Sequence, residues 1–135
     1  MSQENVEIVR RGYELFAAGD LQGVADLVSP EAEVPGAGGL GIAGTMGVRQ
    51  GPQGMLEAMR DALDTFDDYR VEIEETIDAG DAVIVAVLIS GTGRASGLAQ
   101  EERLAHLWVL RDGKAVHGEV HRTIAEARDA VAQRE

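Results

Sequence analysis

The sequence has no cysteine among its 135 residues. This absence excludes a disulfide framework, a zinc–thiolate site and a thiol nucleophile. Long hydrophobic runs are also missing, because the longest, residues 82–89, has only the length of a strand. The acidic, polar start at residues 1–5 lacks the basic and apolar parts of a signal peptide. We therefore expect a soluble protein in the cytoplasm.

Basic residues are scarce: 12 Lys and Arg stand against 24 Asp and Glu, for a net charge of -12. A polyanion repels the phosphates of nucleic acids and anionic lipid headgroups, so we expect neither nucleic acid nor membrane as a partner. Solubility is the ordinary explanation of such a charge. The length fits one domain, 1–135, with enough core to fold without metal or disulfide.

Apolar residues recur at helical spacing in three segments of the first half of the chain. The first runs from Ser2 to about Ala18. The second is short and follows Asp20, which can cap it. The third opens at Gly51-Pro52, where proline occupies the favoured first position of a helix. These patterns predict three helices ahead of most of the strands.

The rest of the chain has the pattern of strands and turns. Glu31 to Val34 predicts a short strand, and the glycine-rich residues 36–54 predict a loop without a phosphate-binding pattern. Thr123 and Glu126 form a capping box for a short C-terminal helix. The strands of the second half are expected from Tyr69 onward and at 83–89, 100–110 and 114–121. Helices followed by a meander predict an α+β fold, with a curved antiparallel sheet around three N-terminal helices and a ligand cavity between them.

The order of elements carries a family resemblance along nearly the whole chain. The segments that carry it are residues 6–16, Gly19-Asp20, residues 51–54, residues 78–81, residues 105–108 and residues 111–114. With them the chain resembles SnoaL-like proteins of the nuclear transport factor 2-like superfamily. The resemblance implies a cone-shaped α+β barrel and a homodimer. The superfamily includes ketosteroid isomerases, polyketide cyclases, epoxide hydrolases and dehydratases, so the fold alone does not give a reaction.

The turn at Asp112-Gly113 is a strong signal for a two-residue hairpin loop. Regular pairing outward from this turn places His106 directly across from Glu119. Side chains alternate between the faces of a strand, so one face of the hairpin is predicted to be mainly polar and the other wholly apolar. The mainly polar face would hold Leu104, His106, Trp108, His117, Glu119 and His121.

Two interpretations of this polar face stay open. Alternation alone favours packing of the apolar face on the helices, with the polar face toward solvent or a second subunit. The resemblance favours the opposite arrangement, because His106 lies where ketosteroid isomerases hold a protonated aspartic acid that donates to the forming oxyanion. In that case the polar face lines the cavity.

The second interpretation gives four candidate catalytic residues. His106 would be a general acid/base or oxyanion donor and Glu119 its orienting carboxylate, with His121 in the next layer. Tyr13 could donate from the first helix, or it could be a core aromatic residue with a satisfied hydroxyl. Four further residues are expected to contact the ligand: Phe16, Met55, Met59 and Trp108.

We expect no metal ion and no cofactor. His117 and His121 lie four residues apart on one strand, roughly 13 Å, too far to share an ion. The stretch Val34-Pro35-Gly36 also lacks the acid that ketosteroid isomerases carry at this place. Two hypotheses remain: a small-molecule-binding domain with acid–base chemistry of the cyclase or isomerase kind on a carbonyl-containing substrate, or a non-catalytic ligand-binding or dimerisation module.

Overall fold

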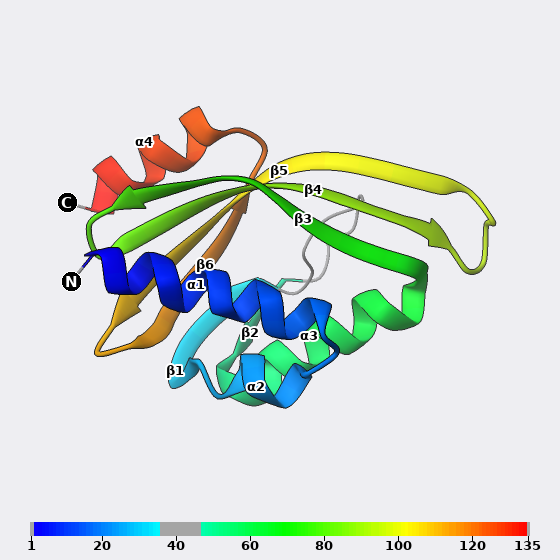
Figure 1. Ribbon diagram of the computed structural model, residues 1–135, viewed down its shortest axis with the longest axis horizontal. Helices are drawn as coiled ribbons and strands as arrows, with labels where there is room; N and C mark the ends of the chain where they lie inside the picture. Colours follow the sequence, from blue (N-terminus) through cyan, green and yellow to red (C-terminus); the bar gives the residue numbers. More distant parts are fainter. Residues whose placement is uncertain (1, 36–46, 135) are drawn as a thin grey trace.

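The computed structural model describes residues 2–35 and 47–134 (Figure 1). The helices are α1 (Ser2–Ala17), α2 (Leu21–Ala25), α3 (Gly51–Thr65) and α4 (Ile124–Arg134). The strands are β1 (Val28–Pro35), β2 (Val48–Gln50), β3 (Phe66–Ala79), β4 (Ala82–Gly93), β5 (Ala99–Arg111) and β6 (Lys114–His121). No helix within these ranges is both long and apolar enough to cross a membrane.

The six strands form one curved, open sheet in the order β2-β1-β6-β5-β4-β3. This confirms the predicted α+β class and the curved sheet. The strand pairs are antiparallel as predicted except one, because β1 runs parallel to β6. Strand β1 lies between β2, with which it pairs in antiparallel orientation, and the last strand, β6.

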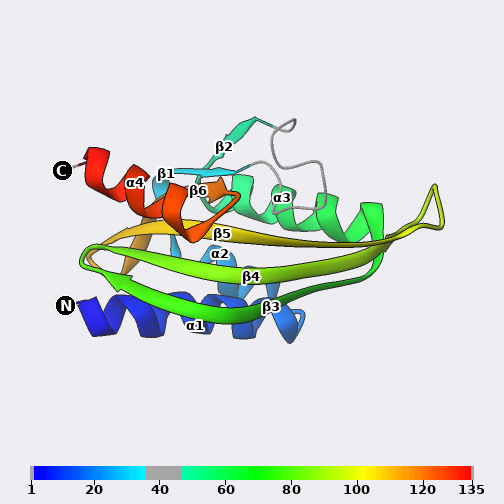
Figure 2. The ribbon, with the colours of Figure 1, turned by 90° about the horizontal axis from the view of Figure 1, so that it is seen from above.

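The helices cover both faces of the sheet, and Figures 1 and 2 show α1, α2 and α3 on the concave face and α4 on the other. Strand β4 is apolar on both faces, as predicted for a central strand. Val85 and Val87 pack with Val9 of α1 in the core of the concave side. Ile84 packs with Ala127 of α4 on the convex side. The curvature of the sheet leaves a hollow between its concave face and the first three helices.

Local signals in the first half of the chain are largely confirmed. The Asp20 side chain accepts a hydrogen bond from the Gly23 amide at 2.9 Å and so caps α2. Strand β1 begins at Val28, three residues before the predicted start, because Val28 pairs with Ala115 of β6. The predicted loop 36–54 contains β2 and the start of α3, since β2 pairs with β1. Residues 36–46 of that prediction lie outside the described residues.

The last hairpin contains a β-bulge, which regular pairing counted outward from the turn did not predict. Asp112 and Gly113 form the predicted turn with φ angles of 53° and 79°, and Arg111 pairs with Lys114. Beyond Leu110 the register shifts, and Val109 pairs with His117. The extra residue in β6, Val116, turns every later side chain to the other face.

The bulge overturns three predicted pairs: Trp108 with His117, His106 with Glu119, and Leu104 with His121. His106 lies opposite Val120 and Trp108 opposite Gly118. Glu119 pairs with Leu107, on the convex side of the sheet. Each of the two interpretations of the polar face therefore holds for one strand. In β5, His106 and Trp108 point into the cavity. In β6, the two histidines and Glu119 point away from it.

Candidate functional site

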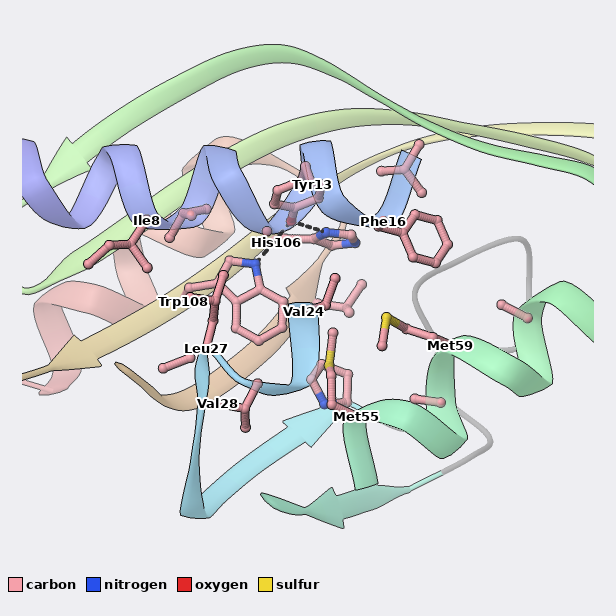
Figure 3. A pocket seen from close by; sticks show the side chains of 18 of the residues that line it. Ile8, Tyr13, Phe16, Val24, Leu27, Val28, Met55, Met59, His106 and Trp108 are labelled. Carbon is pink, nitrogen blue, oxygen red and sulfur yellow. Dashed lines mark hydrogen bonds between the residues drawn. The ribbon is translucent and has the colours of Figure 1, made fainter. Parts of the chain in front are cut away.

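A cavity of about 130 Å³ lies between the concave face of the sheet and helices α1, α2 and α3 (Figure 3). Its walls are mostly aliphatic and aromatic side chains from three helices and four strands. Six residues singled out in the sequence line it: Tyr13, Phe16, Met55, Met59, His106 and Trp108. The curved sheet and the apolar stripes of α1 and α3 bring these residues together from distant parts of the chain.

Three polar side chains in the cavity wall form a hydrogen-bonded chain (Figure 3). The indole Nε1–H of Trp108 donates to the Tyr13 hydroxyl oxygen at 2.9 Å. The same oxygen lies 2.7 Å from Nδ1 of His106. An indole can only donate, so Tyr13 has its own hydrogen to give to Nδ1. In that arrangement a neutral His106 carries its proton on Nε2.

Burial fixes the protonation state of Tyr13. Removal from water raises the pKa of its hydroxyl far above the usual value, although the hydrogen bond from Trp108 acts in the opposite direction. His106 is 6 % exposed and is the sole buried polar or charged residue among those described. At neutral pH the site therefore presents a protonated phenol beside an imidazole. Tyr13 can donate to an oxygen atom that gains negative charge only in the other tautomer, in which His106 carries its proton on Nδ1 and donates to the phenol oxygen.

Gly118 sets the position of Trp108. The two residues pair directly across β5 and β6. A Cβ atom at position 118 would lie 2.5 Å from Cζ3 of Trp108 and 3.1 Å from Cδ of Pro35. Any side chain here would displace the indole ring, so the absence of one lets Trp108 lie against β6 with its Nε1 toward Tyr13.

Tyr69 of β3 is a cavity residue that the sequence analysis did not select. Its ring packs edge-on against Phe16 and stacks on Phe66, with centroids 6.1 Å and 6.0 Å away. Burial raises the pKa of its hydroxyl to about 12. The Tyr69 hydroxyl also raises the pKa of Tyr13, which places both phenols in one electrostatic environment. The alternation of Tyr69 with Val71 signalled a shared face, but nothing in it showed that this face meets the cavity.

Glu119 and His121, two of the candidate catalytic residues, lie on the convex side of β6, away from the cavity. The Glu119 carboxylate accepts from Nε2 of His117 at 2.6 Å and from Nε2 of His121 at 2.7 Å. Arg134 approaches the same carboxylate at 4.0 Å. Burial acts to raise the pKa of Glu119, but the bonds from the two histidines outweigh it, so its pKa is lowered. Because of the β6 bulge, Glu119 cannot orient His106.

This convex cluster gives no sign of a metal centre. Each histidine directs Nε2 at a different oxygen of Glu119, so the carboxylate lies between the two imidazoles. Nowhere in residues 2–35 and 47–134 do three or more His, Asp or Glu side chains gather in a way that could hold a metal ion. The cluster is a hydrogen-bonded network on the outside of the sheet.

Residues 9–118 match the family model of the SnoaL-like domain. No curated protein matches the sequence. The matched range contains α2, α3 and strands β1 to β5, and it includes all three members of the Trp108–Tyr13–His106 chain.

Solved structures with the same architecture cover almost the whole chain. A protein of Burkholderia thailandensis described as NTF2-like is 26% identical, with a TM-score of 0.78 over 91% of this chain and 95% of its own. An NTF2-like protein of unknown function from Burkholderia pseudomallei is 25% identical, with a TM-score of 0.75 over 95% and 97%. TerC, crystallised with polyporic acid, is 24% identical, with a TM-score of 0.74 over 96% and 98%, a likeness of fold.

Proposed function

Since the chain belongs to the SnoaL-like domain family of the NTF2-like superfamily, we propose that its cavity binds a small organic molecule whose polar group is held by Tyr13 and His106. The observation that carries the proposal is the Trp108–Tyr13–His106 hydrogen-bonded chain in an otherwise apolar wall. Apolar pockets with a few convergent polar groups are typical of ligand sites. The fold relatives include a protein crystallised with polyporic acid, which is an organic molecule.

The proposed chemistry is cofactor-free acid–base catalysis on a carbonyl-containing substrate. Tyr13 stays protonated over the physiological range, so with His106 donating to it from Nδ1 its own hydrogen supports donation toward a carbonyl oxygen that becomes negative. His106 would give or take the proton that moves. No carboxylate lines the cavity among the described residues.

That same absence of a carboxylate favours a second candidate, a binding domain without turnover. An isomerase of this fold needs a base on the face opposite the oxyanion donors. Glu33, near the end of β1, lies 3.7 Å from Nδ1 of His117 on the convex cluster and does not line the cavity. Binding and turnover therefore have to be measured separately.

Trp108 offers a direct test of binding, because it is the single tryptophan of the chain and lies in the cavity wall. Its fluorescence would be titrated with a panel of one- to four-ring aromatic and alicyclic ketones. We expect a saturable change with at least one compound. Removal of the hydroxyl in Tyr13→Phe should weaken it by about tenfold, the value of one hydrogen bond.

Glu119→Gln is the matched control, because it alters the convex cluster and leaves the cavity lining unchanged. It should bind as wild type does. No saturable change with any ketone, or equal loss in both variants, would overturn the binding proposal. Turnover that disappears in His106→Gln while binding persists would support the enzyme; binding without turnover of any bound ketone would support the second candidate.

We also propose that the protein is cytoplasmic, and that it forms a homodimer, as the family resemblance implies. Light scattering coupled to size-exclusion chromatography tests the dimer. We expect a mass twice that of one chain across a range of protein concentrations. A constant mass of one chain would contradict it.

A further inference from the structure

We propose that the ligand is an uncharged molecule with about one aromatic ring, and that the Tyr69 hydroxyl donates a hydrogen bond to it. This inference rests on the proposed binding function and narrows it to a substrate class. It also assigns a specificity role to a residue outside the Trp108–Tyr13–His106 chain. Three independent features of the cavity carry it: its volume, the charge of its walls and the surroundings of Tyr69.

The volume limits the ligand to about one ring. The cavity measures about 130 Å³. A buried apolar cavity of roughly 150 Å³ holds benzene, whereas pockets for drug-sized molecules have about 300–1,000 Å³. Met55 and Met59 form part of one wall, and their unbranched side chains can adjust to substituents on a ring. They cannot make room for a fused polycyclic skeleton without moving α3, which packs on β1 and α2.

The walls select against charge. No Asp, Glu, Lys or Arg side chain lines the cavity among the described residues, and its ionisable groups there are Tyr13, Tyr69 and His106. A charged ligand would lose its hydration without gaining an ion pair, which is strongly unfavourable in an apolar site. The net charge of -12 adds repulsion for anions. An uncharged ligand escapes both penalties.

Tyr69 supplies a donor that the protein itself does not use. Its ring is fixed by Phe16 on its edge and Phe66 on its face, and it lines the cavity. Among the described residues its hydroxyl has no hydrogen-bond partner, in contrast to the hydroxyl of Tyr13. The hydroxyl oxygen is not among the fully buried side-chain atoms that lack a partner, so water can reach it, and an acceptor atom on a ligand would take the place of that water.

The test is a fluorescence titration of Trp108 with four probes at neutral pH. Acetophenone is uncharged, has one ring and offers an acceptor; benzoate has similar size with a negative charge; 2-acetonaphthone has two fused rings; toluene has one ring and no acceptor. We expect acetophenone to bind at least tenfold more tightly than benzoate or 2-acetonaphthone. Tyr69→Phe should weaken acetophenone by about tenfold and leave toluene unchanged.

Each failure points to a different part of the argument. Benzoate binding as tightly as acetophenone would overturn the charge argument, and tighter 2-acetonaphthone binding would overturn the size argument. An equal loss of acetophenone and toluene in Tyr69→Phe would show a packing role in place of a hydrogen bond. In those cases the cavity still binds a ligand and the proposed function stands. If none of these probes and no larger ketone binds, the proposed function fails with the inference.

Discussion

At the scale of single residues, the site depends on which side chains donate and which accept hydrogen bonds. The Trp108 indole can only donate, so the Tyr13 oxygen accepts its hydrogen bond. The hydrogen between Tyr13 and Nδ1 of His106 is then carried by one or the other, according to the histidine tautomer. A glycine stands behind this arrangement. Gly118 gives the indole ring its place, and its contribution is the space it leaves empty.

Gly118→Ala tests the role of that space. The added methyl would collide with the Trp108 ring and with Pro35, so we expect a loss of about 1–3 kcal/mol in unfolding free energy, typical of overpacking. The shifted indole should also change its emission and lose the hydrogen bond to Tyr13. Urea unfolding and fluorescence measure both effects.

The matched control is Gly12→Ala in α1, at a glycine that lines the cavity. There the added methyl meets only Cδ1 of Leu27 at 3.7 Å, an ordinary contact. Alanine in a helix interior should raise the unfolding free energy by up to about 1 kcal/mol. If Gly118→Ala and Gly12→Ala change the unfolding free energy in the same direction and by the same amount, the empty space at Gly118 is not what positions Trp108.

Glu119 makes a residue-scale prediction about acid. Its pKa is lowered in the folded protein from an ordinary 4.5, so its contribution to stability is present above pH 4.5 and is lost as pH falls through the lower folded value. Wild type should therefore lose stability on acidification more steeply than Glu119→Gln. Urea midpoints at a series of acidic pH values measure this. Glu14→Gln, on an exposed position of α1, should follow wild type; identical slopes for all three proteins would refute the prediction.

At the scale of elements, the sequence predicted most of what depends on local rules. The Asp20 cap, the helix opening at Gly51-Pro52 and the two-residue turn at Asp112-Gly113 each follow from the conformational preference of one or two residues. Strand β2 was missed because its three residues are held by pairing with β1, which is a tertiary contact. The start of β1 was missed for the same reason.

The sequence placed part of the candidate site in the cavity correctly, and the bulge in β6 explains why the β6 residues were placed wrongly. His106, Tyr13 and the four wall residues line the cavity because the alternation in β5 and the helical stripes hold without interruption. Val116 carries no mark of a bulge, such as a glycine, so regular pairing was the only rule available for β6. One inserted residue was enough to move Glu119 and His121 to the far side of the sheet.

Deletion of Val116 tests how much the bulge contributes. Without Val116, β6 can pair regularly with β5 from the turn onward, with His117 still opposite Val109 and Glu119 still opposite Leu107. We therefore expect the deletion variant to fold with Glu119 and His121 still on the convex side, and to lose about as much stability as Val116→Ala, roughly 1–2 kcal/mol, measured by thermal unfolding and circular dichroism. Failure of the deletion variant to fold while Val116→Ala folds would show that β6 needs the bulge itself.

At the scale of the whole molecule, both tyrosines of the chain belong to one cavity, so alkaline titration reports on the fold. Folding raises both pKa values above 10.0, that of Tyr69 to about 12. The stability this provides is complete below pH 10 and is lost as pH rises through 12. Phenolate absorbance should appear near pH 10 in urea and only above pH 11 in the folded protein. A tyrosine that ionises near pH 10 without unfolding would show an open, hydrated cavity.

The parallel pairing of β1 with β6 has a consequence for how the chain reaches this fold. Val28 pairs with Ala115, so an early strand completes its hydrogen bonds only when the last strand, β6, is present. The meander from β3 to β6 can form from neighbouring hairpins, whereas β1, α2 and β2 must close a long loop to join it. Val34, fully buried in the finished sheet, can pair with Arg49 of β2 before then, but β1 lacks its second neighbour until β6 is in place. The cavity is therefore assembled late, when the two ends of the chain meet.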